Sequence, residues 1–475
     1  MLQEDITLMG ILYWIYCIVA IVVMVRVVLN NRDTFKTLAW VMVLLFLPFL
    51  GLLLYFFFGR DTRRKRIIGA RMLNQIKQRS QLCAVGDGAE AIPQEYAPLV
   101  SFFENTASAP LIAAESIEVI PSTNEFAAKV LEEIMGAKDH VHIQFYIFED
   151  DEFGRSMRDA LVAKARQGLE VRVIYDSVGC WKVNRDFFES MRCAGVYVES
   201  FLKVRFPLLT NKVNYRNHRK VVVVDGRVGF VGGCNIADRY LKGVEWGRWR
   251  DTMLMVRGNA VHGLQNSFLV DWYFANRTLV SGQRYFPFSI QAGGQLVQVV
   301  QSNPVGEVHT VAAGFIKVLS SARSYLYLQT PYFMPDESFM QALKAAALSG
   351  VDVRLMIPER SDSRVADYAA RSYMRPLVVA GVKVYLYKGG MMHGKVLVCD
   401  DALSSVGSVN LDSRSFFYNF EVAAFVYGKE VATALRGNFL EDMKECRLLT
   451  MGEMNGRTLK ERCLESVSRL FSPLL

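Results

Sequence analysis

His218-Arg-Lys220-Val-Val-Val-Val-Asp225 is repeated further along the chain as His393-Gly-Lys395-Val-Leu-Val-Cys-Asp400. Seven residues after each aspartate a second block begins, Gly232-Gly-Cys-Asn235 in the first copy and Gly407-Ser-Val-Asn410 in the second. One His-x-Lys pair can arise by chance, but two copies with the same following spacing indicate a duplicated half-site. A half-site that carries His, Lys and Asn predicts chemistry on one phosphate held between two halves of the protein.

The apolar run inside each motif predicts a buried strand. In the first copy Val221–Val224 forms this strand, and Asp225-Gly226 follows it as a hairpin turn. His218 and Lys220 are two residues apart, so on an extended strand both side chains point to one face. The small residues of the returning turn, here Gly232-Gly233, let backbone amides approach an anion. One such hairpin is more often an ordinary sheet edge, but its repetition favours an active site.

An acidic residue starts a later alternating stretch in each half. Asp251 precedes Gly258 by the same spacing that separates Glu421 from Gly428. A carboxylate behind a histidine fixes the histidine tautomer and stabilises the imidazolium form. We therefore expect these two acids to orient the histidines. For either acid taken alone, a surface salt bridge is the alternative.

The segments around the motifs predict an α/β fold. Each half has an alternating strand, a helix and a further apolar strand: 142–148, 153–166 and 168–174 in the first, and 327–333, 337–348 and 350–357 in the second. Strands that alternate with helices in this way form parallel units covered by helices. We expect tandem duplicated domains, each a mixed sheet flanked by helices, preceded by an N-terminal helical hairpin.

The chain divides into five predicted parts. These are a two-helix membrane anchor at 1–59, a basic connector at 60–110, the first half at 111–290, the second half at 291–448 and a C-terminal amphipathic segment at 449–475. In the last part apolar residues recur at near-helical spacing at Leu459, Cys463, Val467, Leu470 and Phe471. This segment either lies on a membrane or docks on the domain.

Two uncharged runs, Ile6–Val25 and Leu38–Phe58, are each long enough to cross a bilayer as a helix. A signal peptide is the alternative for the first run, but Glu4 and Asp5 precede it where basic residues are expected. Pro48, with Gly51 three residues later, predicts a kink in the second run. The two runs therefore predict a transmembrane hairpin.

Charge favours an anionic partner and a cytoplasmic catalytic domain. The formal net charge is +8, which suits nucleic acid or an acidic membrane surface. Basic residues follow the second apolar run at Arg60, Arg63, Arg64, Lys65 and Arg66, and fewer lie in the loop between the runs, at Arg26, Arg32 and Lys36. The larger cluster predicts the cytoplasmic side and attracts anionic lipid head groups.

No metal or cofactor is expected. The eight cysteines are scattered and form no Cys-x-x-Cys pair, so neither a zinc site nor a thioredoxin-like centre is indicated. We interpret them as reduced, small apolar residues. No metal-ligand motif accompanies the two histidines.

These residues resemble the phospholipase D superfamily, in which an HxKxxxxD motif is duplicated in the same way, and within it the bacterial cardiolipin synthases. The resemblance covers nearly the whole chain and no motif residue is lost. It includes Leu47-Pro-Phe-Leu-Gly51, Asn217-His218-Arg-Lys220, Gly247-Arg-Trp-Arg-Asp251, Thr330-Pro-Tyr-Phe333 and Asn419-Phe-Glu421.

The resemblance implies transfer of a phosphatidyl group through a covalent phosphohistidine, with His218 as nucleophile and His393 as general acid and base. Phosphate oxygens would be bound by Lys220, Lys395, Asn235 and Asn410. Asp225 and Asp400 complete the catalytic motif. Their odd spacing from the lysine puts them at the strand end, which makes a structural role at least as compatible with the sequence.

The implied reaction joins two phosphatidylglycerol molecules into cardiolipin and releases glycerol, at the bacterial inner membrane. A membrane phospholipase D that uses water, or a transphosphatidylase with another acceptor, is the alternative enzyme. The two apolar runs count against a nuclease, so no nucleic acid partner is expected. Intact His, Lys and Asn in both copies count against a catalytically silent membrane scaffold.

Overall fold

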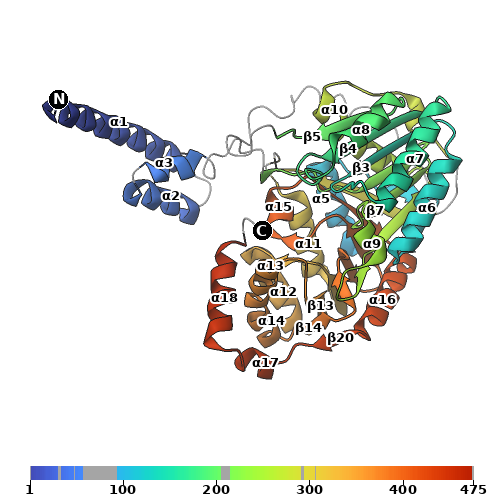
Figure 1. The fold of residues 1–475 in the computed structure, drawn as a ribbon. Helices are drawn as coiled ribbons and strands as arrows, with labels where there is room; N and C mark the ends of the chain where they lie inside the picture. Colours follow the sequence, from blue (N-terminus) through green and yellow to red (C-terminus); the bar gives the residue numbers. More distant parts are fainter. Residues whose placement is uncertain are drawn as a thin grey trace. The chain divides into compact units, whose positions relative to one another are not determined.

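The computed structural model of the 475-residue chain describes residues 2–29, 34–47, 49–56, 94–204, 214–289, 294–304, 306 and 308–472. The chain separates into two compact units (Figure 1). The first unit lies within residues 1–67 and 204–213, and the second within residues 68–203 and 214–475.

The described part of the first unit is helical. It contains α1 (Leu2–Leu29), α2 (Thr34–Phe46) and α3 (Leu50–Leu54). These helices pack on one another through an apolar cluster that includes Val27, Leu44 and Tyr55. The Tyr16 hydroxyl of α1 donates to the Leu44 carbonyl of α2 at 3.0 Å. The two apolar runs of the sequence therefore form helices that contact each other.

The second apolar run is broken. Helix α2 ends at Phe46 and α3 begins at Leu50, and the sequence between them contains Pro48, which has no backbone N–H to continue a helix. Among the described residues, no helix is both long and apolar enough to cross a membrane. The predicted transmembrane hairpin is therefore not confirmed, and the basic cluster at 60–66 lies outside the described residues.

The second unit contains both motif copies. The part around the first copy comprises β2 (Ser116–Ile120), α6 (Thr123–Gly136), β3 (His140–Phe145), α7 (Glu152–Arg166), β4 (Glu170–Asp176), α8 (Arg185–Cys193), β5 (Tyr197–Phe201), β6 (Val221–Val224), β7 (Val228–Gly232), α9 (Asp238–Lys242), β8 (Arg248–Arg250), β9 (Met253–Arg257) and α10 (Val261–Asn276).

The remaining elements belong mainly to the second copy. They comprise α5 (Ala97–Ala107), β1 (Ile112–Ala114), β10 (Gln295–Ser302), α11 (Thr310–Ser321), β11 (Tyr325–Gln329), β12 (Phe333–Met334), α12 (Glu337–Leu348), β13 (Asp352–Pro358), α13 (Arg364–Ser372), α14 (Met374–Val379), β14 (Lys383–Tyr387), β15 (Gly390–Met392), β16 (Val396–Cys399), β17 (Leu403–Gly407), β18 (Leu411–Asp412), α15 (Ser413–Phe417), β19 (Glu421–Tyr427), α16 (Lys429–Met443), β20 (Cys446–Leu448), α17 (Met451–Asn455) and α18 (Leu459–Leu470).

Each motif hairpin belongs to its own mixed sheet. The first sheet has seven strands in the order β2-β9-β7-β6-β3-β4-β5, and the second has nine in the order β1-β10-β19-β17-β16-β11-β13-β14-β20. Three neighbouring strands are parallel in each, β3-β4-β5 and β11-β13-β14. The motif strands β6 and β16 add to them in antiparallel orientation. The predicted duplicated α/β fold with mixed sheets is confirmed.

The valine run Val221–Val224 shows how the two sheets meet. Val222 lies in a cluster with the helices of the first half, whereas Val221 and Val223 lie in a cluster with Val396 of the second motif strand. Successive residues of a strand alternate between its faces. One strand therefore buries one face under its own helices and the other against the opposite sheet, which explains why every residue of the run is apolar.

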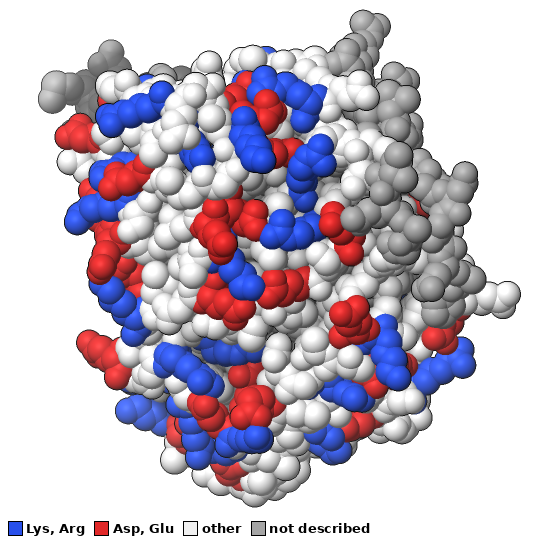
Figure 2. Space-filling model, turned by 90° about the vertical axis from the view of Figure 1, so that its right-hand side faces the viewer, with Lys and Arg blue, Asp and Glu red and all other residues white. Residues whose placement is uncertain are grey.

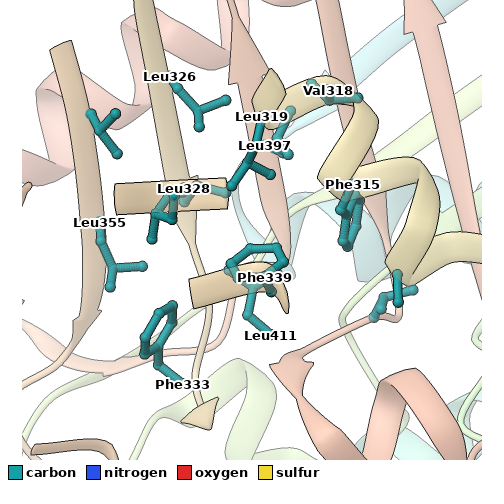
Figure 3. Close-up of a cluster of buried hydrophobic side chains, with 14 of the residues drawn as sticks. Phe315, Val318, Leu319, Leu326, Leu328, Phe333, Phe339, Leu355, Leu397 and Leu411 are labelled. Atoms are coloured by element: carbon teal, nitrogen blue, oxygen red, sulfur yellow. The ribbon is translucent and has the colours of Figure 1, made fainter. Parts of the chain in front are cut away.

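The core of the second half lies between its sheet and the helices α11 and α12. Figure 3 shows Leu326 and Leu328 of β11 together with Phe315 of α11 and Phe339 of α12. The side chains of Leu326, Leu328 and Phe339 are fully buried. This cluster fixes the position of β11, against which the second motif strand is paired.

Two segments near position 100 cross to the second half. Helix α5 lies within the stretch predicted as a connector, and its Phe103 is buried in the core of the second half. Strand β1 follows α5 and pairs with β10, at the edge of the second sheet. These two segments therefore precede the first half in the chain but pack with the second half in space. The apolar stretch Leu99–Phe103 was the sequence signal for this helix.

Phe339→Ala is expected to lower the free energy of unfolding by about 3–5 kcal/mol, because it removes buried contacts and leaves a cavity. The shift of the urea unfolding midpoint measures this effect. Leu348→Ala on the same helix is the matched control, since Leu348 is 73% exposed. Equal midpoints for the two variants would contradict the packing described for α12.

Candidate active site

Each motif histidine follows a short backbone pairing with the opposite half. Asn217 forms a parallel bridge with Phe420, and the His218 amide donates to the Phe420 carbonyl at 2.9 Å. In the second copy Met392 pairs with Arg250 in the parallel ladder between β15 and β8. In both cases the next residue is a histidine on one side and an acid on the other. Local register thus brings each histidine to an acid of the other half.

The resulting contacts cross between the halves. His218 Nδ1 lies 3.0 and 3.1 Å from the two carboxylate oxygens of Glu421, and His393 Nδ1 lies 2.5 Å from Asp251 Oδ2. The side chains of Glu421 and Asp251 are fully buried, whereas those of His218 and His393 are 12% and 7% exposed. In a neutral ring the Nδ1 hydrogen donates to the carboxylate, which leaves the lone pair on Nε2 for chemistry.

The two motif lysines lie beside their own histidines. Lys220 Nζ donates to the His218 carbonyl at 2.7 Å. Lys395 Nζ donates to the His393 carbonyl at 2.5 Å and lies 2.8 Å from His393 Nδ1. The sequence predicts that His and Lys lie on the motif strands. In the structure they precede the strands, since β6 and β16 begin one residue after these lysines. Both ammonium groups are buried at the junction of the halves.

Burial lowers the pKa of both histidines, that of His218 to about 4 and that of His393 to about 3. Burial also lowers the pKa of Lys395, to about 8. Burial alone would raise the pKa of Glu421 and Asp251, but the neighbouring histidines and lysines outweigh it, so both carboxyls have a pKa below the ordinary value. Near neutral pH the site therefore holds neutral imidazoles and ionised carboxylates.

Comparison with known proteins identifies one family, with relatives that match almost the whole chain. The family described as "Cardiolipin synthase, PLD-like domain" matches residues 130–272 and 315–443. A curated cardiolipin synthase of Geobacillus sp. (strain WCH70) is 39% identical, with 94% of this chain and 90% of the relative covered. The major cardiolipin synthase ClsA of Bacillus subtilis (strain 168) is 38% identical, with 98% and 99% covered.

The chain belongs to the cardiolipin synthase family of phospholipase D-like proteins. A second family description, "Phospholipase_D-nuclease N-terminal", matches residues 13–60. The crystal structure of phosphatidylserine synthase from Haemophilus influenzae Rd KW20 covers 80% of this chain, with a TM-score of 0.62 and 15% identity. At that identity the likeness shows a shared fold, which is the duplicated architecture described above.

Within this family fold, the carboxylates of Asp225 and Asp400 accept hydrogen bonds from backbone amides. The Asp225 carboxylate accepts hydrogen bonds from the amides of Lys138, Asp139 and His140, at 2.8 to 2.9 Å. Asp400 does the same for the three residues that lead into β11, at 2.7 to 2.9 Å. Both aspartates stand at the far end of the motif strand from the histidine. The geometry favours the structural alternative for these two residues over a catalytic one.

The two motif asparagines are buried in the turns that follow β7 and β17. The Asn235 side chain donates to the Tyr240 hydroxyl at 2.5 Å and accepts from the Ile147 amide at 3.2 Å. The Asn410 side-chain oxygen is buried and has no hydrogen-bond partner among the described residues. Asn235 is therefore held firmly by its neighbours, while Asn410 keeps a polar atom free.

Gly233 and Ser408 occupy matching positions and explain the small residues of the two turns. The Gly233 amide donates to the Thr252 carbonyl, so this amide does not supply the anion contact predicted for the turn. A Cβ at Gly233 would lie 2.1 Å from Asp251 Oδ1, so glycine is needed for the acid to fit. In the other half the Ser408 hydroxyl donates to the Glu421 carboxylate.

A pair of buried arginines also supports the site, and sequence reasoning missed their role. Arg219 donates to the Glu421 carbonyl at 3.0 Å and to Asp271 at 2.7 Å. At the matching place in the second half, Asp442 receives Arg250 at 2.9 Å. The second motif has Gly394 where the first has Arg219. This difference between the motifs was the available sequence signal for the two arginines. Arg219 lies inside the first motif, whereas Arg250 is the last residue of β8.

The described residues offer no obvious place for a metal. No group of three or more His, Cys, Asp or Glu side chains is arranged to hold an ion within the ranges the structure describes. The seven described cysteines form no disulfide with one another, and Cys83 lies outside the described residues.

Asp225→Ala is expected to lower the free energy of unfolding by about 1–3 kcal/mol, because three backbone amides lose their acceptor. The turnover rate per folded molecule should stay close to that of the unaltered protein, because the carboxylate is not at the histidines. Thermal unfolding and initial rates measure the two effects. Asp159→Ala, at a 67% exposed side chain, is the control. A large loss of rate with unchanged stability would restore a catalytic role.

Proposed function

We propose that this chain is a phosphatidyltransferase that joins two phosphatidylglycerol molecules into cardiolipin and releases glycerol. The observation that carries this proposal is the pair of crossed contacts, in which each histidine is oriented through Nδ1 by a buried carboxylate of the opposite half. Membership of the cardiolipin synthase family supports the substrate class.

In the first proposed step His218 Nε2 attacks the phosphorus of one phosphatidylglycerol. A P–N bond forms and the P–O bond to glycerol breaks. Protonated His393 gives its proton to the leaving glycerol oxygen. Glu421 stabilises the positive charge that develops on the His218 ring. The negative charge of a bound phosphodiester would raise the pKa of His393 and so favour protonation of that ring.

In the second proposed step His393 takes a proton from the terminal glycerol hydroxyl of another phosphatidylglycerol. The resulting alkoxide attacks the phosphorus, the P–O bond of cardiolipin forms and the P–N bond to His218 breaks. Splitting one displacement into two in this way is covalent catalysis. The assignment of nucleophile and acid to these two histidines follows the family resemblance.

Lys220 and Lys395, with Asn235 and Asn410, are proposed to bind the non-bridging phosphate oxygens. Buried, preorganised donors stabilise charge in a transition state without reorganisation at the moment of reaction. The lysines already lie beside the histidines, and both asparagines are buried in the turns that follow β7 and β17. Exclusion of water by this buried arrangement favours a lipid hydroxyl as acceptor over hydrolysis.

The first unit is proposed to hold the enzyme at the cell membrane, with the catalytic unit on the cytoplasmic side. Large apolar side chains of α1 are exposed, among them Trp14 at 69%, Ile18 at 61% and Val22 at 61%. An exposed apolar surface of this size indicates a partner surface of lipid or protein. Membrane attachment keeps both lipid substrates near the site.

The purified full chain in phosphatidylglycerol vesicles is expected to form cardiolipin and one glycerol for each, with a chelator present. His218→Ala and His393→Ala should each lose more than about 100-fold in rate, because nucleophile and acid act together. His262→Ala, a buried histidine of α10, is the control. Lipid chromatography and a glycerol assay give the products.

Phosphatidic acid as the main product would show that the protein is a hydrolase and not a synthase. Absence of turnover by the unaltered protein would leave the scaffold alternative. Near-normal rates in either histidine variant would reject the two-histidine mechanism.

The value of kcat/KM is expected to fall above about pH 8. Burial lowers the pKa of Lys395 to about 8, so its ammonium group is charged below that pH and neutral above it. If this charge binds phosphate, kcat/KM falls about tenfold with each further pH unit. The phosphodiester has no pKa in this range. A profile that stays flat to about pH 10, the ordinary range of a lysine, would exclude this role.

A further inference from the structure

The C-terminal helix α18 has its polar side inward and its apolar side outward. It packs along α13, and its buried residues are Glu465 and Ser468. Leu459 and Leu470 are 76% and 77% exposed, and Val467 is 54% exposed. A helix of a soluble domain normally turns its apolar stripe to the core. The reversed orientation leaves an apolar stripe with no cover from the described part of the second unit.

The inward polar face is well bonded, so the orientation is not accidental. Glu465 forms an ion pair with Arg457, and both side chains are largely buried. Thr458 and Glu461 form a capping box that starts the helix, which stabilises it independently of apolar packing. Sequence analysis offered membrane contact and docking on the domain as alternatives, and the two faces of α18 allow both at once.

A basic groove lies beside the apolar stripe. It has a volume of about 650 Å³, and its lining includes Arg375, Arg457, Arg462, Arg469 and one acid, Glu465. The Arg469 guanidinium lies 4.4 Å from the centre of the Tyr373 ring. Since Arg457 is paired with Glu465, the groove retains positive charge from the other three. Arginine guanidinium groups suit phosphate oxygens.

The arginine-rich lining of this groove contrasts with the face shown in Figure 2. There, lysines and arginines are mixed with aspartates and glutamates and no single sign dominates. Figure 1 shows α18 at the margin of the second unit, next to α13. An apolar stripe flanked by cationic residues is the pattern of a helix that lies in a membrane interface, with its apolar side in the acyl region and its cations at the head groups.

We propose that α18 docks the catalytic unit on an anionic bilayer, with Leu459, Val467 and Leu470 in the acyl boundary and the arginine groove on lipid phosphates. A second copy of the chain is the main competing occupant. A two-fold contact would bring the same arginines against themselves, which electrostatics disfavours. No step of the proposed chemistry enters this inference, so it stands apart from the proposed function.

Cys463 lies on the exposed apolar side of α18 and Cys193 is exposed at the end of α8. Two full-length proteins, Cys193→Ala and Cys463→Ala, are labelled with an environment-sensitive thiol fluorophore and placed in phosphatidylserine–phosphatidylcholine vesicles that carry a nitroxide lipid. All other cysteines are common to both, so the difference isolates the two positions. We expect stronger quenching in the protein that retains Cys463. Equal quenching would overturn the docking.

Arg462→Gln and Arg375→Gln test the groove in the Cys193→Ala background. Each should lower the ratio of inserted to free α18 about fivefold, since a basic residue near an anionic surface contributes ~1 kcal/mol. Lys444→Gln, at a 71% exposed side chain just after α16, is the control. Unchanged quenching in both arginine variants would overturn the phosphate-binding groove.

Energy transfer between labelled copies without lipid quenching would also overturn the proposal, because it would make α18 an interface between chains. Phosphatidylserine is anionic but is not the proposed substrate. Failure of this test is therefore distinguishable from failure of the proposed reaction, which is measured on phosphatidylglycerol.

Discussion

Glu421 of the second half orients His218 of the first, and Asp251 of the first half orients His393 of the second. Neither half therefore contains a complete histidine–carboxylate pair. The pairs form only when the two sheets pack together through the valine faces that include Val221 and Val396. The apolar interface and the polar site are thus two aspects of one contact, and loss of packing between the sheets would also separate the catalytic groups.

Burial at this interface has an electrostatic consequence. It favours neutral histidines and weakens the charge of Lys395, while the surrounding cations keep Asp251 and Glu421 ionised. In the proposed reaction the negative charge of the phosphodiester lies between the lysines and favours the protonated histidine that the first step requires.

The two half-sites are similar but not equal. Asp251 is the shorter acid and packs directly on Gly233, whereas Glu421 is longer and receives the Ser408 hydroxyl. Arg219 lies inside the first motif and binds Asp271. The matching arginine, Arg250, lies directly before Asp251 and binds Asp442. Different surroundings for two chemically identical histidines are consistent with the two different roles proposed for them, one as nucleophile and one as acid and base.

Repetition and periodicity in the sequence were sufficient to predict the duplicated α/β fold. They also supplied the candidate histidines, lysines and acids, but not the arginine–aspartate pairs that support them. The repeated motif, its valine run and the later acids identify the strands and the reactive groups, because buried strands and catalytic side chains leave local patterns. The packing of helix α5 on the second sheet was missed because strand β10 follows the helix by almost two hundred residues, and no local pattern indicates which sheet a helix joins.

The sequence alone determined which side chains are available: two histidines, two lysines and two acids at matched spacing, with apolar residues around them. Only the tertiary structure decided which acid meets which histidine, that Asp225 and Asp400 bind backbone amides, and which side of α18 faces outward. The physical reason is that spacing along the chain limits local geometry, whereas contacts between the halves depend on how two sheets pack, and packing energy is shared by many residues far apart in sequence.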